Sequence, residues 1–591
     1  MKTYKPTIKR LFAFLAVMIF SVASLWAQQR DSRVREYLSP KRIVWMNHAE
    51  RISGSQHLLR EGTGQTDLTN KYICRMISTK DSLPSILLDF GEELHGGLQI
   101  VTGMPGDHAP IKVRVRFGES VSEAMSEVGD KGATNDHAMR DMELELPWLG
   151  VAEIGNSGYR FVRIDMLDAD RDLHLKEVRA VSIYRDIAYR GAFKCSDERL
   201  NKIWQVGART VHLNMQEYLW DGIKRDRLVW IGDMHPEVTT ITNVFGYNEV
   251  VPKSLDLARD TTDLPAWMSG ISSYSIWWLL IHRDWYYYTG DKAYLEQQKD
   301  YMTALLRQLL SKVDAEGIEC LDGNRFLDWP SNANPVAIHA GLQALMVMAM
   351  DAGSELAEIL GDEKLSKECG AMYEKMKAAA PKVSKQYFEQ GKAPHEPGTK
   401  QGAALLVLAD LMDPAKADKE ILSVSGARGF STFYGYYMLQ AMAKAGNYNG
   451  AMQIIRDFWG AMIDLGATSF WEDFNVDWLP NAAPIDELVP EGKKDIHGDY
   501  GAYCYVGFRH SLCHGWASGP TSWLTEHVLG VKVVEPACRV VRIVPHLGDL
   551  QWVEGRFPTP YGDIEISHRK GADGKITSKI KAPNGVKVVS R

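Results

Sequence analysis

Apolar and polar residues alternate with a period of two over much of the first third of the chain. Between Ile111 and Phe117 every second residue is apolar, and the residues between them are basic. Such alternation is typical of strands that are buried on one side. Similar segments lie at Ile86–Phe90, Tyr159–Met166 and Val178–Tyr184, with glycine-rich turns between them. We therefore expect an N-terminal β-sandwich over residues 30–190.

The spacing of apolar residues becomes helical near residue 196. The first helical stripe consists of Leu200, Ile203, Trp204, Ala208 and Val211. Further stripes follow at Leu295–Leu309, Leu365–Met376, Gly402–Met412, Phe433–Ala443 and Met452–Ile463. So many similar segments favour antiparallel helix pairs that close into an (α/α)6 helical barrel over residues 195–525. A helical solenoid is the alternative, but no repeat of fixed length is visible.

The period returns to two after about residue 530. Ile564, Ile566 and Ile576 are expected in strands, and turn sequences stand at Asp573–Gly574 and Asn584–Gly585. Both dipeptides are typical of tight β-hairpins. We expect a small C-terminal β-sandwich domain over residues 530–591, so that β domains flank the helical barrel on both sides.

The first 27 residues resemble an export signal. A positively charged start containing Lys2, Lys5, Lys9 and Arg10 precedes the almost wholly apolar run Leu11–Ala27. This layout is typical of a cleaved secretory signal peptide, and the run is shorter than most membrane spans. We expect residues 1–27 to be removed and the mature protein to be periplasmic or secreted. An uncleaved anchor is the alternative. No later stretch is expected to span a bilayer.

The amino-acid composition of the chain argues against several classes of function. The chain has 591 residues, a net charge of −7 and 24% charged residues, so nothing favours a nucleic-acid partner. Its seven cysteines are odd in number and widely spaced, which predicts free thiols rather than a disulfide framework or a zinc site. We expect no membrane contact after signal cleavage. The oligomeric state stays open.

One segment early in the helical region concentrates charge beside an aromatic residue. Residues 221–237 contain four acidic and three basic side chains together with Trp230. Pro236 and two glycines predict a loop rather than a helix. Charges packed so densely are unfavourable in a core unless they are paired. The segment is therefore either an active site or a structural network of ion pairs.

Three further segments place an acidic residue or a histidine beside aromatic rings: residues 467–478 around Glu472, residues 511–520 around His514, and Arg325–Pro330. Aromatic rings suit the apolar faces of sugars, and carboxylates and imidazoles bind hydroxyl groups. The aromatic neighbours of Glu472 favour a raised pKa and hence proton transfer near neutral pH. Each segment alone is also compatible with ordinary packing, but together they indicate a sugar-binding pocket.

Other catalytic chemistries find little support in the sequence. No metal site is expected, because the histidines 235, 282, 497, 510 and 514 lack a metal-ligand spacing such as HExxH. A serine nucleophile is not expected either, since GxSxG is absent. Hydrolysis by acid and base groups needs only water, so no cofactor is expected.

These segments resemble those of the α-L-rhamnosidases of glycoside hydrolase family 78. The family pattern D-C-P-Q-R-D-E-R-L-G-W-T-G-D is similar to residues 221–233, T-x-W-E-x-W is similar to residues 468–474, and S-L-N-H-Y-A-x-G is similar to residues 511–519. The order of the three is the same, and the resemblance extends over about residues 85–570. It implies an exported inverting glycosidase that releases terminal rhamnose from oligosaccharides or glycosides of plant type.

The resemblance also implies roles for individual residues. Glu472 corresponds to the general base. The general acid of the family is the Glu after R-D, but this chain is one residue shorter there and reads Arg225-Asp226-Arg227. Asp226 is therefore our first candidate for the acid, and Glu237 is the second. The expected sugar-binding residues are Asp221, Arg225, Trp230, Asp233, Asp328, Trp329, Trp471 and His514.

Two other functions stay open at this point. The missing Glu is compatible with a degenerate protein that binds carbohydrate without cleaving it. A polysaccharide lyase on a similar barrel would use a tyrosine and a histidine, for which Tyr500, Tyr503 and His497 are available. The products distinguish the three functions. A rhamnosidase would release free rhamnose, a binding protein would form no product, and a lyase would form an unsaturated uronate.

Overall fold

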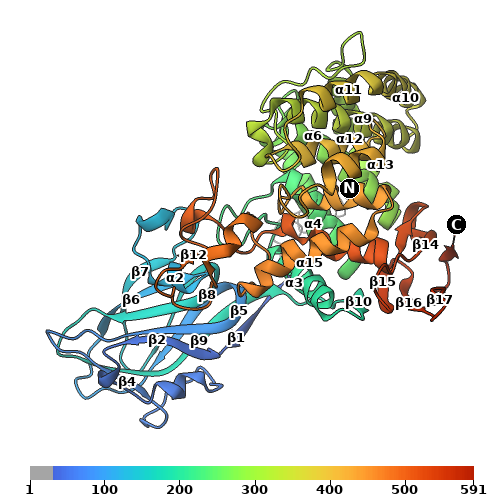
Figure 1. The fold of residues 1–591 in the computed structure, drawn as a ribbon. Coiled ribbons are helices and arrows are strands. Elements are labelled where there is room, and N and C mark those ends of the chain that lie inside the picture. Colours follow the sequence, from blue (N-terminus) through green and yellow to red (C-terminus); the bar gives the residue numbers. More distant parts are fainter. Residues whose placement is uncertain (1–30, 591) are drawn as a thin grey trace, which may run out of the picture.

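The computed structural model describes residues 31–590. It contains an N-terminal sheet domain, a large central helical domain and a small C-terminal domain of β-strands (Figure 1). This order confirms the sequence-based prediction at the level of domains. The predicted export signal at residues 1–27 lies outside the described residues.

The N-terminal domain is built from nine hydrogen-bonded strands. The long strands β5, β8 and β9 change partners along their length, and this joins all nine strands in one network. Every strand predicted from the alternating pattern lies in one of these elements. The elements are β1 (Arg33–Leu38), β2 (Arg42–Asn47), β3 (Ile52–Ser53), β4 (Cys74–Ile77), β5 (Ser85–Thr102), β6 (Ile111–Gly118), α2 (Val121–Met125), β7 (Asp141–Leu146), β8 (Val151–Met166) and β9 (Asp172–Arg185).

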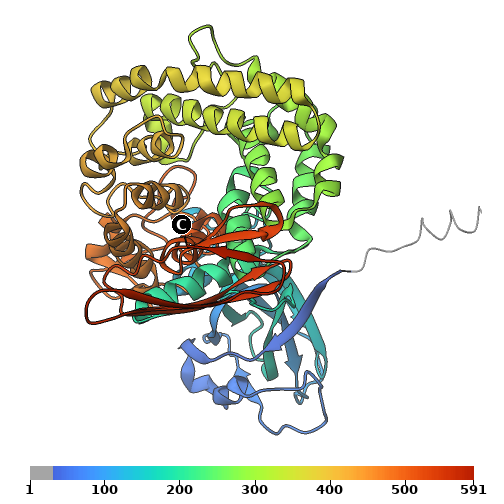
Figure 2. The same cartoon turned by 90° about the vertical axis from the view of Figure 1, so that its right-hand side faces the viewer.

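The helices of the central domain lie around a ring (Figure 2). They enclose a continuous core that extends into the C-terminal strands. The helices are α3 (Glu198–Asn214), α4 (Ile231–Val244), α5 (Val250–Asp260), α6 (Ser272–Thr289), α7 (Lys292–Gln297), α8 (Lys299–Leu310), α9 (Pro335–Ile359), α10 (Glu363–Ala378), α11 (Ala380–Gln390), α12 (Thr399–Leu408), α13 (Pro414–Ala417), α14 (Gly435–Lys444), α15 (Tyr448–Asp464) and α16 (Gly519–Trp523). The short strands β11 (Ala482–Ala483) and β12 (Lys494–Asp495) lie in the irregular segment before α16.

One expectation about this domain is wrong. Residues 231–237 were expected in a loop, but they form the first turns of α4 despite Gly232 and Pro236. The apolar side chains of α4 pack into the core, and that packing outweighs the missing proline N–H. By length and composition helix α9 is apolar enough to cross a membrane, but 78% of its most apolar window is buried inside the protein. A helix that is apolar on all sides is typical of such a core position.

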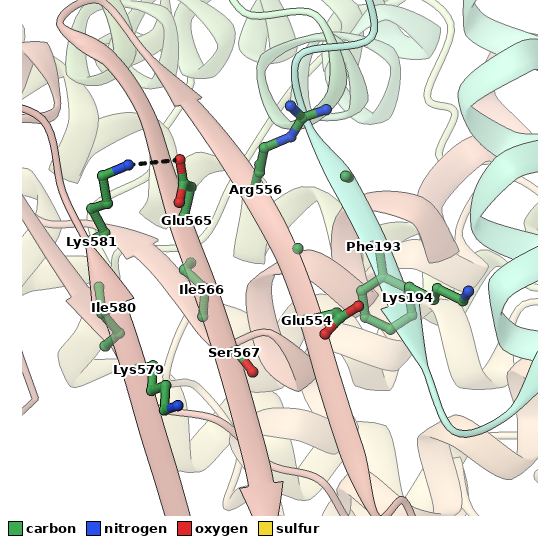
Figure 3. A pocket seen from close by; sticks show the side chains of 12 residues that line it. Phe193, Lys194, Glu554, Arg556, Glu565, Ile566, Ser567, Lys579, Ile580 and Lys581 are labelled. Atoms are coloured by element: carbon green, nitrogen blue, oxygen red, sulfur yellow. Dashed lines mark hydrogen bonds and ion pairs between the residues drawn. The ribbon is translucent and has the colours of Figure 1, made fainter.

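The C-terminal strands form two small sheets. Figure 3 shows that β10 (Ala192–Cys195), which precedes the helical domain, lies beside the C-terminal strands. One sheet has the order β10-β15-β16-β17 and the other β13-β14-β18. The remaining bounds are β13 (Val531–Val533), β14 (Val540–Ile543), β15 (Trp552–Thr559), β16 (Gly562–Lys570), β17 (Ile576–Lys581) and β18 (Lys587–Val589).

One of the two predicted hairpins in this region is confirmed. The turn at Asp573–Gly574 joins β16 to β17, which pair in antiparallel fashion. The hairpin expected at Asn584–Gly585 is wrong, because β18 leaves the sheet of β17 and pairs in parallel with β14. A turn sequence bends the chain locally, but it does not determine the strand with which the following residues pair.

Candidate active site

Three of the four polar segments from the sequence meet beside the start of α4. The backbone N–H of Gly515 donates to the carbonyl of Asp221 at 2.8 Å. The backbone N–H of Glu472 donates to the carbonyl of Ser511 at 3.0 Å. Main-chain hydrogen bonds therefore hold together segments that are distant in the sequence, and they fix the relative positions of the side chains.

Glu472 stands at the centre of a line of buried polar groups. The N–H of Ser511 donates to Oε2 of Glu472 at 2.9 Å, and Nδ1 of His514 lies 3.6 Å from Oε1. On the other side of the ring, Nε2 of His514 lies 3.1 Å from Oδ2 of Asp233. The hydroxyl of Tyr274 donates to Oδ1 of Asp233 at 3.0 Å. The imidazole of His514 thus bridges two carboxylates.

His514 and the carboxylates around it stabilise each other's charged forms. Burial by itself lowers the pKa of His514, but Glu472, Asp233 and Asp221 outweigh this effect and raise that pKa to about 9. Burial raises the pKa of Glu472, while His514 and Arg225 act in the opposite direction. His514 is therefore protonated at neutral pH, and it stabilises the carboxylate that a general base requires.

The raised pKa of His514 predicts a pH-dependent contribution to stability. A protonated histidine stabilises the fold fully below its ordinary pKa of 6.5 and loses this effect as the pH rises through about 9. We expect the parent to lose up to about 3 kcal/mol more unfolding free energy than His514→Gln between pH 6 and pH 9.5. Urea denaturation at both pH values measures the difference.

The matched control for this measurement is His497→Gln. His497 is also fully buried, but burial lowers its pKa well below the ordinary value, so it stays neutral over the whole interval. Its variant should follow the pH dependence of the parent. Parallel curves for the parent and for His514→Gln would contradict the assignment of a charged His514.

The loop between α3 and α4 presents Asp226 to solvent. Asp221 closes this loop, because its Oδ1 accepts from the N–H of Leu228 at 2.9 Å. Asp226 keeps 22% of its side chain exposed. Its Oδ1 lies 3.3 Å from Nη2 of Arg225 and 3.4 Å from Nε2 of His137. Asp226 is therefore the more accessible of the two acid candidates.

The shortening of the loop coincides with an unusual backbone conformation. Arg227 has a φ of 64°, which is uncommon for a residue other than glycine. Its guanidinium donates to the carbonyl of Asn156 at 3.0 Å and lies over the ring of Trp220. The Arg227 side chain thus points to the N-terminal domain, and Arg225 is the arginine that pairs with Asp226.

The second acid candidate, Glu237, lies one turn after Asp233 on α4. Its side chain is fully buried, and among the described residues neither carboxyl oxygen has a hydrogen-bond partner. Burial, together with Asp233 and Asp221, raises the pKa of Glu237 well above its ordinary value. This environment favours the protonated form of Glu237, but the side chain has no access to solvent.

Gly515 leaves space for the carboxyl group of Glu237. A Cβ at position 515 would lie 1.6 Å from Oε1 of Glu237. We expect Gly515→Ala to lower the unfolding free energy by about 1–3 kcal/mol, as overpacking does elsewhere. The control is Gly106→Ala, where no atom lies within 4 Å of the added Cβ. Urea denaturation measures these free energies. Adding Glu237→Ala to Gly515→Ala should recover part of the lost unfolding free energy. If the losses of the two single variants simply add, this contact is excluded.

Aromatic rings connect the start of α4 to the fourth polar segment. Neighbouring rings are in edge contact along the series Trp230, Tyr274, Phe326, Trp329, Tyr505 and Trp516. The ring of Trp516 lies 4.3 Å from that of His514. Trp230 and Trp329 keep part of their surface exposed. These rings form an aromatic wall that begins and ends beside the Asp233–His514–Glu472 line.

Two residues that were expected to bind substrate are almost fully buried. Trp471 is only 1% exposed and packs on Phe474. Asp328 is also buried, and both of its carboxylate oxygens accept hydrogen bonds from Ser331, Ser431 and Gln401. Protein groups occupy the surfaces of both side chains in this conformation, and their direct contacts with a sugar stay a prediction.

Both ring nitrogens of His497, the histidine proposed for lyase chemistry, contact polar groups of the protein. His497 is fully buried, and its ring nitrogens contact the hydroxyl of Ser120 at 2.8 Å and the carbonyl of His510 at 2.9 Å. Tyr500 stacks on Trp478, and Tyr503 is exposed. A histidine with both nitrogens engaged cannot serve as the base of a lyase, and the sequence-based alternative loses its support.

Nothing in the sequence indicated that the N-terminal domain contributes to the site. Glu119, which directly follows β6, is fully buried, and its Oε2 accepts from the N–H of Leu512 at 2.7 Å. Its Oε1 lies 3.3 Å from the hydroxyl of Ser511, whose N–H holds Glu472. Lys224 pairs with Glu119 at 2.9 Å. Glu119 therefore supports the segment that positions Glu472.

We expect Glu119→Gln to lower kcat about tenfold with little change in KM, since the loss of a charge-assisted hydrogen bond of about 1.5 kcal/mol corresponds to that factor. The matched control is Glu123→Gln. Glu123 contacts the same Lys224 ammonium at 3.1 Å, but no bond connects its carboxylate to Ser511 or Leu512 in the described residues. Both variants should lose similar stability, and only Glu119→Gln should lose kcat. Equal losses of kcat would assign Glu119 a purely structural role.

The same cluster brings three potential metal ligands together. Oxygen atoms of Glu119 and Glu123 and a ring nitrogen of His497 lie within 4.8 Å of one another. The ammonium of Lys224, however, bonds to both carboxylates. The positive charge that a metal ion would supply is therefore already provided by the chain itself.

Comparison with known proteins identifies the family. The model of the bacterial alpha-L-rhamnosidase 6 hairpin glycosidase domain matches residues 188–528, and that of the bacterial alpha-L-rhamnosidase C-terminal domain matches residues 530–589. An alpha-L-rhamnosidase of Formosa agariphila is 22% identical over 82% of this chain and 54% of its own length. The chain thus spans about half the length of the curated relatives it matches.

Solved structures show the same fold. The family 78 rhamnosidase of Bacillus sp. GL1 has a TM-score of 0.72 at 22% identity, over 91% of this chain and 55% of that one. The rhamnosidase of Klebsiella oxytoca, solved with rhamnose bound, has a TM-score of 0.63 at 21% identity, over 86% of this chain and 98% of that one. Because the two domain models together match more than half of its residues, the chain belongs to the bacterial α-L-rhamnosidases of glycoside hydrolase family 78.

Proposed function

We propose that this protein is an α-L-rhamnosidase that releases terminal rhamnose from glycosides of plant type by an inverting mechanism. The observation that carries the proposal is the environment of Glu472, a buried carboxylate held by the Ser511 N–H and stabilised by the His514 cation. The family membership supports the same reaction, and the relative from Klebsiella oxytoca was solved with rhamnose. In this proposal the ring of helices is an (α/α)6 barrel.

In the proposed mechanism Glu472 removes a proton from a water molecule, which attacks the anomeric carbon. Asp226 donates its proton to the leaving oxygen on the opposite face of the sugar. Inversion requires the two carboxyl groups to stand roughly 6.5–9.5 Å apart, so that the water fits between them. Arg225, Asp233 and His514 would bind the hydroxyl groups of rhamnose. Trp230 and Trp329 would pack on its apolar face.

The stereochemistry of the product tests this proposal directly. Proton NMR of the full chain with an aryl α-L-rhamnoside should show β-L-rhamnose as the first product, before it equilibrates in water. Initial α-L-rhamnose would indicate retention and would refute the inverting mechanism. An unsaturated sugar, or no reaction at all, would refute hydrolysis itself.

A second candidate is a protein that binds rhamnosides without cleaving them. The observation in its favour is the shortened loop, in which Asp226 pairs with Arg225 and lies beside His137. Titration calorimetry with rhamnose would then show binding, while no product would form even on prolonged incubation. Any rhamnose release that depends on Glu472 would exclude this candidate.

We also propose that the mature protein is exported to the periplasm or beyond. The positively charged start and the apolar run Leu11–Ala27 support this proposal. N-terminal sequencing of the protein from the extracytoplasmic fraction should give a sequence that begins near residue 28. A sequence beginning at Met1 would point to an uncleaved anchor instead.

A further inference from the structure

A large cavity lies between the helical domain and the C-terminal strands. Its volume is about 1060 Å³, and its walls come from α4, α6 and α14 on one side and from β13 and β14 on the other. The C-terminal sheets lie across the ring of helices here (Figure 2). The volume is at the upper end of the roughly 300–1,000 Å³ of small-molecule sites, which is enough for a short oligosaccharide.

This cavity is distinct from the candidate active site. On α4 it is lined by His235, Val238 and Thr239, whereas Asp233 and Glu237 do not line it. The ring of His235 stacks on the buried ring of Tyr437 at 5.7 Å. The inference therefore does not depend on the rhamnosidase reaction.

The wall provides groups that bind hydroxyls. The carboxylate of Glu526 accepts from the Tyr436 hydroxyl at 3.3 Å and from the amide of Gln440. Burial raises the pKa of Glu526 to about 7, so this group can donate or accept a hydrogen bond near neutral pH. Oδ1 of Asn243 is buried and has no partner among the described residues.

A pair of stacked aromatic rings lies in the same wall. The rings of Tyr448 and His546 stack at 3.7 Å with only 8° between their planes. Both residues line the cavity. Flat aromatic surfaces of this kind pack against the apolar faces of sugar rings.

Lys532 and Arg542 line the cavity and form no ion pair with another residue of the described range 31–590. Lys532 on β13 and Arg542 on β14 are directly opposite each other across the two strands, and both line the cavity. Neither is paired within 4.0 Å in that range, although the charge of Lys532 acts on the Glu526 carboxylate in the same wall and favours its ionised form. Like charges directly opposite across two strands are destabilising, so fold stability does not explain the pair. By contrast, Arg283 and Lys444, which also line the cavity, are paired with Asp284 and Asp410.

We propose that this cavity is a second carbohydrate site, which binds a short acidic oligosaccharide. Lys532 and Arg542 bind its anionic group, Glu526 and Asn243 bind hydroxyls, and the Tyr448–His546 pair supports a sugar ring. The carboxylates within the cavity disfavour a polyanion such as a nucleotide. The anionic group is either a uronate or a sulfate ester, since both fit two adjacent cations.

Calorimetry with the full chain tests the proposal. The probes are a galacturonate disaccharide, a sulfated disaccharide, and the galacturonate disaccharide with its carboxyl groups reduced to alcohols. We expect one or both anionic probes to bind and the reduced probe to bind at least about tenfold more weakly. Added salt should weaken the binding of the anionic probes. Equal binding of acidic and reduced probes, or binding of none, would overturn the proposal.

Substitutions of the two cations test whether the anionic probe binds in this cavity. Lys532→Gln with Arg542→Gln should weaken binding of the anionic probe at least about tenfold and leave hydrolysis of an aryl rhamnoside unchanged. The control is Lys579→Gln with Lys581→Gln, which removes two cations from β17 in the other C-terminal sheet (Figure 3). If the double variant at 532 and 542 unfolds, saturation-transfer NMR on the parent should still place the probe against Tyr448 and His546. Unchanged binding in a folded double variant, or no transfer from these rings, would contradict the assigned site.

Discussion

The Glu472→Gln variant is expected to hydrolyse an aryl α-L-rhamnoside about 10²–10⁴-fold more slowly than the parent, with little change in KM. Gln keeps the shape of the side chain and can still accept the hydrogen bond from the Ser511 N–H. It cannot, however, take a proton from water. Initial rates over a range of substrate concentrations separate kcat from KM, and a change confined to kcat indicates a group that acts in the transition state.

A matched surface variant controls for the loss of a carboxylate in the same segment. Asp477→Asn lies five residues further on, where Asp477 is exposed and pairs with Arg428 at 2.7 Å. It should keep the activity of the parent. Azide, a small anionic nucleophile, should react in the space left by the base and give a glycosyl azide of inverted configuration with Glu472→Gln. A Glu472→Gln variant with activity within a few-fold of the parent would refute the role of general base.

The order of domains could be predicted because period and spacing are local properties of the sequence. Ile111–Phe117 alternates strictly, and it lies in β6 with apolar side chains buried on one face. The stripe that begins at Leu200 lies in α3, whose N-cap Asp197 accepts from two backbone N–H groups. In both cases the side chains that produce the pattern are those that pack into the core.

Partners that are distant in sequence could not be predicted in this way. The four residues of β10 precede the helical domain, yet they pair with β15 more than 350 residues later. Glu119 stands in the N-terminal domain, yet it supports Ser511 and Leu512 through buried hydrogen bonds. A single sequence records no distance between such residues, so these contacts appear only in the folded chain.

The candidate site was predicted in its segments but not in every residue. The polar segments around Asp221, Glu472 and His514 do meet, because main-chain hydrogen bonds join them. Proximity to aromatic residues in the sequence was a weaker guide: the neighbouring ring of Trp471 points into the core, whereas Trp516 lies against His514. The backbone conformation determines which side chains of a segment face the site, and the amino-acid composition of the segment does not reveal that conformation.

The Asp226→Asn variant is expected to lose about 10²–10⁴-fold in kcat on a natural rhamnoside but only a few-fold on an aryl rhamnoside with a good leaving group. The poor leaving group of a natural glycoside needs the proton of the general acid, whereas an activated phenolate leaves without it. The partial exposure of Asp226 allows contact with a substrate. Release of rhamnose from both substrates, measured in parallel with each variant, gives the ratio that identifies the acid.

Glu237→Gln is the isosteric comparison, and we expect only small and equal losses on the two substrates. Burial raises the pKa of Glu237 well above its ordinary value and so favours the neutral carboxyl, which an amide matches in both charge and shape. The side chain of Glu237 is also fully buried, so its carboxyl group has no contact with solvent. If the dependence on the leaving group appears in Glu237→Gln instead, the loop must open during catalysis and Glu237 is the donor. If neither variant shows it, the shortened loop has lost its acid, and binding without efficient hydrolysis of natural glycosides becomes the better description of this chain.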